Sequence, residues 1–339
     1  MHTHDSDVLA FALNACTNAS TTACTASSRA WLVTIIATSG SSPRPAGAML
    51  ACCDDGSQAG SVSGGCVEED LIERLQAGEF DAQRICRLKY GVSAEENARL
   101  GLPCGGQLDL IVQSLHPEDG DWLQAILNAI GERRCLQRQV SLDDGHTALQ
   151  PLAHFAELKV GETHLAQSFG PRYRMLLVGA GQLAASLAEL ALAMDYEVLV
   201  TDPRPDTLKQ WTGPDVPRLP GMPDDVVRAQ AADRFSVVIT LTHDPRIDDM
   251  ALMEALESDA WYVGALGSKR TTEKRLQRLQ ALDIPQDKID RLQAPVGLDI
   301  GSKTPLEIAV AIMAQLVQLR RRPTPNRVAP AQAGANLRR

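Results

Sequence analysis

The feature that most constrains this chain is a strand, a glycine turn and a helix in direct succession. Residues 175–190 read MLLVGAGQLAASLAEL, an apolar run followed by Gly179-x-Gly181 and then by small and apolar residues at helical spacing. Glycines in such a turn let the backbone come close to a phosphate at the amino terminus of the helix. Asp202 ends the next strand, where an acidic side chain can bind ribose hydroxyls, and Arg204 could instead accommodate a 2′-phosphate. The segment predicts a nucleotide site, or a glycine turn that serves only the packing of helix on strand.

Strand-like and helix-like segments alternate through the rest of this half. The expected strands are 175–178, 197–201, 237–241 and 261–264, and the expected helices are 183–194, 246–257 and 269–282. Such alternation predicts a parallel sheet with helices on both faces and a ligand at the carboxyl ends of the strands. We therefore expect an α/β chain with a Rossmann-like carboxyl-terminal domain over residues 171–320. Residues 321–339 have little apolar periodicity and are expected to form a disordered tail.

The first half of the chain has a different character, because glycine-rich loops separate short apolar runs. Strands are expected at 31–38, 47–52, 61–63 and 108–113, with a helix beginning at Cys66. Residues 1–160 are therefore expected to form a small α+β domain. Residues 115–171 are polar and weakly patterned, and we place the linker between the two domains in the second half of this segment.

Composition excludes several classes of protein. The chain has 339 residues, with 33 Lys and Arg against 42 Asp and Glu, a net charge of -9, and only 4% aromatic residues. This balance argues against nucleic acid as a partner, since neither a basic footprint nor a stacking platform is available. The absence of a basic leader and of an apolar run of about 18 residues predicts a cytoplasmic protein with no membrane partner. The 8 cysteines fit neither a disulfide scaffold nor a zinc site, so reduced thiols are expected, and a homodimer is the commonest assembly.

Two further loops follow expected strands in the second half. Thr242-His243-Asp244 follows one strand, and the glycine-rich segment 264–270 follows the next and enters a helix at Lys269. A glycine loop with a cation at a helix start suits an anionic ligand, so Lys269 is a candidate contact. His243 is either a hydrogen-bonded turn residue or a proton-transfer or ligand residue.

In the first half, two cysteines stand in matched glycine frames. The segment 63–66 reads SGGC and runs into a helix, whose positive end would lower the pKa of the Cys66 thiol; segment 101–106 reads GLPCGG. Two such frames favour reactive thiolates over buried, inert cysteines. Arg44, in the nearby segment GSSPR, is a candidate anion clamp. The candidate contacts in this half are Arg44, Ser63, Gly64, Gly65, Cys66, Cys104, Gly105 and Gly106.

Several segments resemble the xanthine dehydrogenase accessory factor family, called XdhC/CoxI. They are GSSPRPAGAML (40–50), GSVSGGCVE (60–68) and GLPCGG (101–106), together with LLVGAGQLAASLA, TDPRP, THD, YVGALGSKR and GLDIGSKTPLEIAVAI in the second half. The resemblance implies a protein that binds molybdenum cofactor (molybdopterin), protects it during sulfuration with a cysteine desulfurase, and delivers it to a xanthine dehydrogenase-type enzyme. The family's cysteine motifs fall on Cys66 and Cys104, which would contact molybdenum or carry sulfur, and its PR motif falls on Arg44.

Two other functions remain open at this point. One is an NAD(P)-dependent oxidoreductase that uses Gly179, Gly181 and Asp202 for the nucleotide and His243 as acid or base. The other is a nucleotide-sensing or scaffolding protein, in which the second half binds a ligand only to change the affinity for a partner.

Overall fold

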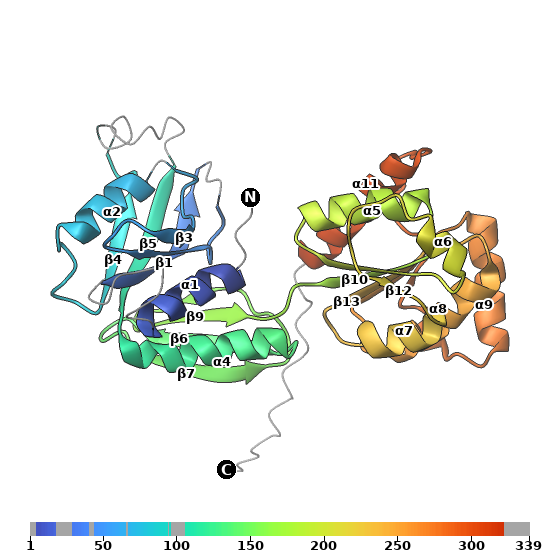
Figure 1. The fold of residues 1–339 in the computed structure, drawn as a ribbon, viewed down its shortest axis with the longest axis horizontal. Coiled ribbons are helices and arrows are strands. Elements are labelled where there is room, and N and C mark those ends of the chain that lie inside the picture. Colours follow the sequence, from blue (N-terminus) through green and yellow to red (C-terminus); the bar gives the residue numbers. More distant parts are fainter. Residues whose placement is uncertain are drawn as a thin grey trace, which may run out of the picture. The chain divides into compact units, whose positions relative to one another are not determined.

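A computed structural model describes residues 5–17, 29–40, 44–65, 67–93, 95 and 106–321. The chain divides into two compact units, Met1–Pro171 and Arg172–Arg339 (Figure 1). Within the described residues, no helix is long and apolar enough to cross a membrane. The expected tail lies almost wholly outside these residues.

An antiparallel sheet of five strands organises the amino-terminal unit, in the order β3-β2-β1-β5-β4. Its strands are β1 (Ala30–Ser39), β2 (Met49–Cys53), β3 (Gln58–Gly60), β4 (Ile85–Tyr90) and β5 (Gln107–Leu115). The central strand β1 is almost wholly buried, and both of its faces are covered. Trp31 and Val33 pack with Leu71 and Leu75 of α2 (Glu68–Gln76), whereas Leu32 faces the opposite side.

The opposite face of this sheet packs against helices and a second sheet. The helices are α1 (Asp5–Thr17) and α4 (Gly120–Gly131), and the turn η1 (Pro117–Asp119) precedes α4. The second sheet is antiparallel, with the order β7-β6-β9-β8. Its strands are β6 (Cys135–Ser141), β7 (Thr147–Leu152), β8 (Lys159–Val160) and β9 (His164–Phe169). Leu136 and Phe169 join the cluster around Leu32, so this sheet belongs to the core of the unit.

The second sheet corrects the expectation of a linker in the second half of residues 115–171. Hydrophobic periodicity does not reveal these strands because several of their inward positions are polar: Gln137, Arg138 and Gln167 are all buried. The expected strand at 61–63 is also wrong. The backbone of Ser63 donates to the carboxylate of Glu68 rather than to a neighbouring strand, so this segment is a loop after β3.

Six parallel strands form the sheet of the carboxyl-terminal unit, in the order β12-β11-β10-β13-β14-β15. The strands are β10 (Arg174–Val178), β11 (Glu197–Thr201), β12 (Arg218–Leu219), β13 (Ser236–Thr240), β14 (Tyr262–Ala265) and β15 (Leu292–Gln293). The helices are α5 (Gln182–Ala193), α6 (Pro205–Lys209), α7 (Pro223–Gln230), α8 (Pro245–Glu257), α9 (Lys269–Ala281), α10 (Gln286–Ile289) and α11 (Pro305–Arg321). This is the strand order of a Rossmann fold, which confirms the expected fold class.

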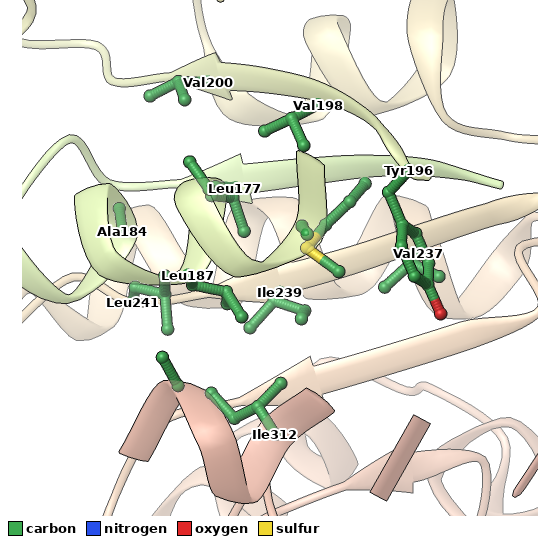
Figure 2. Packing of buried hydrophobic residues seen from close by; sticks show 14 of the residues in the cluster. Leu177, Ala184, Leu187, Tyr196, Val198, Val200, Val237, Ile239, Leu241 and Ile312 are labelled. Atoms are coloured by element: carbon green, nitrogen blue, oxygen red, sulfur yellow. The ribbon is translucent and has the colours of Figure 1, made fainter. Parts of the chain in front are cut away.

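Alternate residues of the buried strands face opposite helical layers. Leu177 of β10 and Ile239 of β13 pack with Leu187 of α5 and Ile312 of α11 (Figure 2). Leu176, one position away on β10, joins the other cluster, which is formed largely by α7, α8 and α9. Both faces of the sheet are covered by helices, so a ligand is expected to bind at the carboxyl ends of the strands.

Candidate functional site

Three motif-bearing connections leave the five-stranded sheet at the same end. The registers place the carboxyl ends of β1, β3 and β4 beside the amino ends of β2 and β5. The strand termini at this end are Ser39, Met49, Gly60, Tyr90 and Gln107. The connections 40–48, 61–67 and 91–106 therefore all begin from one end of the sheet. They are the segments in which the sequence places Arg44, Cys66 and Cys104.

The side chain of Glu68 accepts hydrogen bonds from the second of these connections, residues 61–67. Its carboxylate is buried, with 5% of the residue exposed. It accepts hydrogen bonds from the Ser61 hydroxyl at 2.6 Å, from the Ser63 backbone at 2.9 Å and from the Gly65 backbone at 3.0 Å. Further donors are the backbone of Val62, the backbone of Val67 and the hydroxyl of Ser63. The amides of Ser63 and Gly65, expected to face a ligand, thus serve an internal carboxylate.

The same contacts determine the charge of Glu68. Burial alone would raise its pKa, but the hydrogen bonds from Ser61 and Ser63 outweigh burial and lower the pKa from 4.5 to about 2. Gly64 does not contact the carboxylate; its backbone donates to the Ser61 hydroxyl at 2.9 Å. The loop that leads into α2 is therefore built around a fixed negative charge.

The third connection is closed at its base by two glycines. Gly91 has φ +82°, and a Cβ placed on it would lie 2.2 Å from the carbonyl oxygen of Gly106. Only glycine allows this approach. Gly106 is thus fixed beside the end of β4. Cys66, Cys104 and Gly105 lie outside the described residues, so their expected roles stay predictions.

The cysteines that the structure describes behave differently from one another. Cys16, Cys52, Cys86 and Cys135 are free, whereas Cys53 is disulfide-bonded. The expectation of reduced thiols throughout is therefore wrong at Cys53. Burial raises the pKa of the Cys52 thiol to about 12, which makes this position unsuited to thiolate chemistry. Within the described ranges, His, Cys, Asp and Glu form no cluster of three that could hold a metal ion.

Arg44 lines a cavity of about 360 Å³ at the same end of the sheet. The walls come from α1, from residues 44–49, from the end of β3, from the segment between β7 and β8, and from β9. Ser61 also lines this cavity, and its hydroxyl donates to the Glu68 carboxylate, so one residue belongs to both the cavity and the 61–67 loop. Arg44 and Ser61 of the 61–67 loop therefore line the same cavity in the amino-terminal unit.

In the carboxyl-terminal unit, the glycine turn lies where the strand order reverses. The chain runs from β10 outward to β12 and then returns to β13, so the ends of β10 and β13 flank this point. Gly179 has φ +109°, and a Cβ on it would lie 2.9 Å from Cγ2 of Thr242, which follows β13. Gly181 is the N-cap of α5. Crevices of this kind bind ligands in open α/β sheets.

Asp202 is not exposed to such a ligand. Its side chain is fully buried and accepts hydrogen bonds from the Ala180 backbone at 3.2 Å and from Arg204 Nε at 2.8 Å. Burial would raise its pKa, but the bonds from Arg204 and Ala180 lower it below the usual value. In this structure the Asp202 carboxylate stabilises the glycine turn by its hydrogen bond from the Ala180 backbone, and the half-exposed Arg204 side chain covers this carboxylate. Ribose binding by Asp202 stays a prediction that requires Arg204 to move.

His243 and Lys269 are both exposed, each on a loop at the carboxyl edge of the parallel sheet. His243 follows β13, and Lys269 opens α9 after its N-cap, Ser268. The structure therefore places Gly181, His243 and Lys269 after neighbouring parallel strands. Their contacts with a ligand are not tested by this arrangement.

Sequence reasoning missed the buried network beneath these loops. Asp248 accepts a hydrogen bond of 2.7 Å from the Thr242 hydroxyl and one of 2.9 Å from Arg275, and Arg275 also donates to the Leu266 carbonyl at 3.1 Å. Both members of the ion pair are buried, and burial raises the pKa of Asp248. The network ties the His243 loop to the loop before Lys269. Asp248 and Arg275 lie on separate helices, α8 and α9, so no local sequence pattern predicts that they pair.

The chain matches known families in both units. Residues 23–91 match the XdhC and CoxI family, and residues 175–316 match the XdhC Rossmann domain. The first match spans the Arg44 segment and the 61–67 loop, and the second spans nearly the whole parallel sheet.

Three known proteins are similar to this chain over most of its length. A protein of Bacillus subtilis (strain 168), named as a probable xanthine dehydrogenase subunit, is 26% identical over 315 residues, which cover 86% of this chain and 93% of that protein. The molybdenum cofactor insertion chaperone PaoD of Escherichia coli (strain K12) is 27% identical over 293 residues, covering 85% and 83%. A crystal structure described as a xanthine dehydrogenase from Bacillus halodurans has a TM-score of 0.72 and 25% identity, with 98% of each chain covered. With both of its units matched, this chain belongs to the XdhC and CoxI family.

Proposed function

We propose that this protein is a molybdenum cofactor insertion chaperone that serves a xanthine dehydrogenase-type enzyme. The observation that supports it most is the meeting of three motif-bearing connections at one end of one sheet, beside a cavity lined by Arg44. The names of the similar proteins point the same way, since one is a cofactor insertion chaperone and another belongs to a xanthine dehydrogenase.

The chemistry of the residues fits this cargo. Molybdenum cofactor is a pterin that carries a dithiolene for the metal and an anionic phosphate. Soft thiolates such as those of Cys66 and Cys104 suit molybdenum, and a guanidinium such as that of Arg44 suits a phosphate. In this proposal Ser63, Gly64 and Gly65 act by shaping the loop around Glu68.

The later steps of the proposal concern protection and transfer. The bound cofactor is held away from water during sulfuration by a cysteine desulfurase, and it is then delivered to the client enzyme. We place these events in the cytoplasm, with the chaperone acting as a homodimer. The two thiols are the groups that can hold the metal end of the cofactor while its sulfur is exchanged.

The crevice of the carboxyl-terminal unit is proposed as a nucleotide site. Its supports are the glycine turn at Gly179 and Gly181, the strand reversal and the nearby Lys269. An NAD(P)-dependent oxidoreductase is the less favoured alternative, because the carboxylate of Asp202 forms an ion pair with Arg204 and the side chain of His243 is exposed to solvent.

Anaerobic titration of molybdopterin tests the proposal. The wild-type protein, Cys66→Ser and Cys104→Ser are each titrated, and pterin absorbance is measured after gel filtration. Cys86→Ser is the matched control, since Cys86 is a free cysteine near the other end of β4. We expect stoichiometric retention by the wild type and the control, and loss in at least one motif variant. No retention by folded wild type would reject the chaperone, and full retention by both motif variants would reject the role of the thiols.

A further inference from the structure

The cavity beside Arg44 is lined by a buried glutamine with one oxygen that no other residue in the described part of the chain hydrogen-bonds. Gln167 of β9 lines the cavity and is only 4% exposed. Its Nε2 donates to the carbonyl oxygen of Gly47 at 2.9 Å, which fixes the plane of the carboxamide. Among the described residues, its Oε1 has no hydrogen-bond partner. A buried acceptor without a donor is unfavourable, so an N–H group that reaches this oxygen would be stabilised.

Arg44 supplies the opposite polarity in the same cavity. It is half-buried in the connection between β1 and β2, and its guanidinium can donate to an oxygen or to an anion. A ligand that presents both N–H donors and a carbonyl acceptor would therefore match Gln167 and Arg44 together.

The remaining walls combine apolar residues with polar ones, among them Asp5 and Ser168. Val8 and Met49 are buried apolar residues that line the cavity, and Ala48 and Leu158 also contribute. Gly60 completes the wall, where a Cβ would lie 2.3 Å from the carbonyl oxygen of Met49. The volume of about 360 Å³ is within the range of small-molecule sites. Apolar walls combined with a few polar groups are typical of small-molecule sites, and a pterin ring carries both an apolar face and polar edges.

We propose that this cavity binds the pterin ring of the cofactor, with Gln167 accepting from its amino-pyrimidine edge and Arg44 donating to an oxygen of the ligand. The inference rests on the proposed function, and it assigns a ring-binding subsite separate from the two thiols. Ser61 connects the two parts, because it lines the cavity and also hydrogen-bonds Glu68 in the motif loop. Occupation of the cavity thus places the ring at the start of the loop that leads to Cys66.

The test uses pterin-6-carboxylate, a fluorescent pterin that has no dithiolene and no metal. Its affinity for the full-length protein is measured by fluorescence titration for the wild type, Gln167→Met and Arg44→Gln. Gln137→Met is the matched control, since Gln137 is a similarly buried glutamine of β6 outside the cavity lining. We expect each cavity variant to bind about tenfold more weakly, as the loss of one hydrogen bond to a bound ligand predicts, and the control to bind normally. Circular dichroism and urea unfolding confirm that each variant is folded.

The outcomes separate this inference from the proposed function. Equal affinity in the wild type and both folded cavity variants would overturn the assignment of the cavity. Retention of molybdopterin without binding of pterin-6-carboxylate would overturn it as well, while the chaperone proposal would stand. Binding of the fragment through Gln167 and Arg44 without retention of molybdopterin would support the subsite and reject the chaperone. Binding of neither ligand would reject both.

Discussion

Replacing Glu68 by glutamine tests whether a buried carboxylate shapes the loop that leads into α2. Glutamine keeps the size of the side chain but removes the charge and turns one acceptor oxygen into an amide donor. That donor would face the backbone N–H groups that now serve the carboxylate. The folded protein lowers the pKa of Glu68 from 4.5 to about 2. Since one pKa unit corresponds to about 1.4 kcal/mol, the charged form contributes up to about 3 kcal/mol to the free energy of unfolding at neutral pH.

The pH dependence follows from the direction of this shift. The folded-state pKa lies below that of the unfolded chain, so the unfolded state takes up the proton first as the pH falls. The stabilisation is fully present above pH 4.5 and is lost as the pH falls toward the folded-state pKa of about 2. The free energy of unfolding of the wild type should therefore exceed that of Glu68→Gln by about 3 kcal/mol at neutral pH. This difference in free energy should shrink below pH 4.5.

Urea unfolding across this pH range measures the difference. Glu69→Gln is the control, because Glu69 is the next residue of the same helix and lies outside the set of groups that hold the loop. It should change the unfolding free energy by less than about 0.5 kcal/mol. Equal stability of wild type and Glu68→Gln at neutral pH, or a difference that stays constant into acid, would refute the role given to the carboxylate.

Further predictions follow from single contacts. Gly60→Ala should cost more than about 3 kcal/mol, because the new Cβ would meet backbone, whereas Gly47→Ala, with φ +93° and open space around its Cβ, should cost about 1–2 kcal/mol; thermal unfolding compares them. Arg275→Met should cost about 3–5 kcal/mol by leaving a buried carboxylate unpaired, and the half-exposed Arg278→Met less than about 1 kcal/mol; equal losses in urea would contradict this. Arg204→Ala should strengthen binding of NADH in a fluorescence titration by uncovering the acid beneath it, and unchanged affinity would show that Arg204 does not block a ribose site.

The carboxyl-terminal fold could be predicted because its strands carry the signal locally. The segment SVVIT of β13 is buried along its whole length, as a central parallel strand should be, and it reads as an unbroken β-branched run. The second sheet of the amino-terminal unit has no such signal. Gln137, Arg138 and Gln167 occupy buried positions on its strands, so hydrophobic periodicity describes the segment as polar and weakly ordered.

The candidate site was predictable in its residues more than in its contacts. The glycine frames are expected to contact a ligand, which stays a prediction; the close backbone approach of Gly91 to Gly106 is not among the expectations. They do not reveal which group the amides serve. Glu68 reads as an acidic residue favoured by the helix dipole, and only the structure shows that its carboxylate fills the loop in front of the helix. Similarly, the Asp248–Arg275 pair joins two helices and is set by packing alone.

The two ends of the five-stranded sheet bear on whether the motifs serve a ligand site, as proposed, or only turn the chain. At the end opposite to the motifs, where the disulfide-bonded Cys53 ends β2, polar contacts also join the described connections. Arg29 donates to the Gln76 carbonyl at 3.0 Å and pairs with Asp81, while Gln76 donates to the carbonyl of Asp54 at 2.9 Å. If the motifs served only to turn the chain, nothing would confine them to one end, because antiparallel strands need turns at both. Their position at the end with the Arg44-lined cavity therefore supports the proposed ligand site.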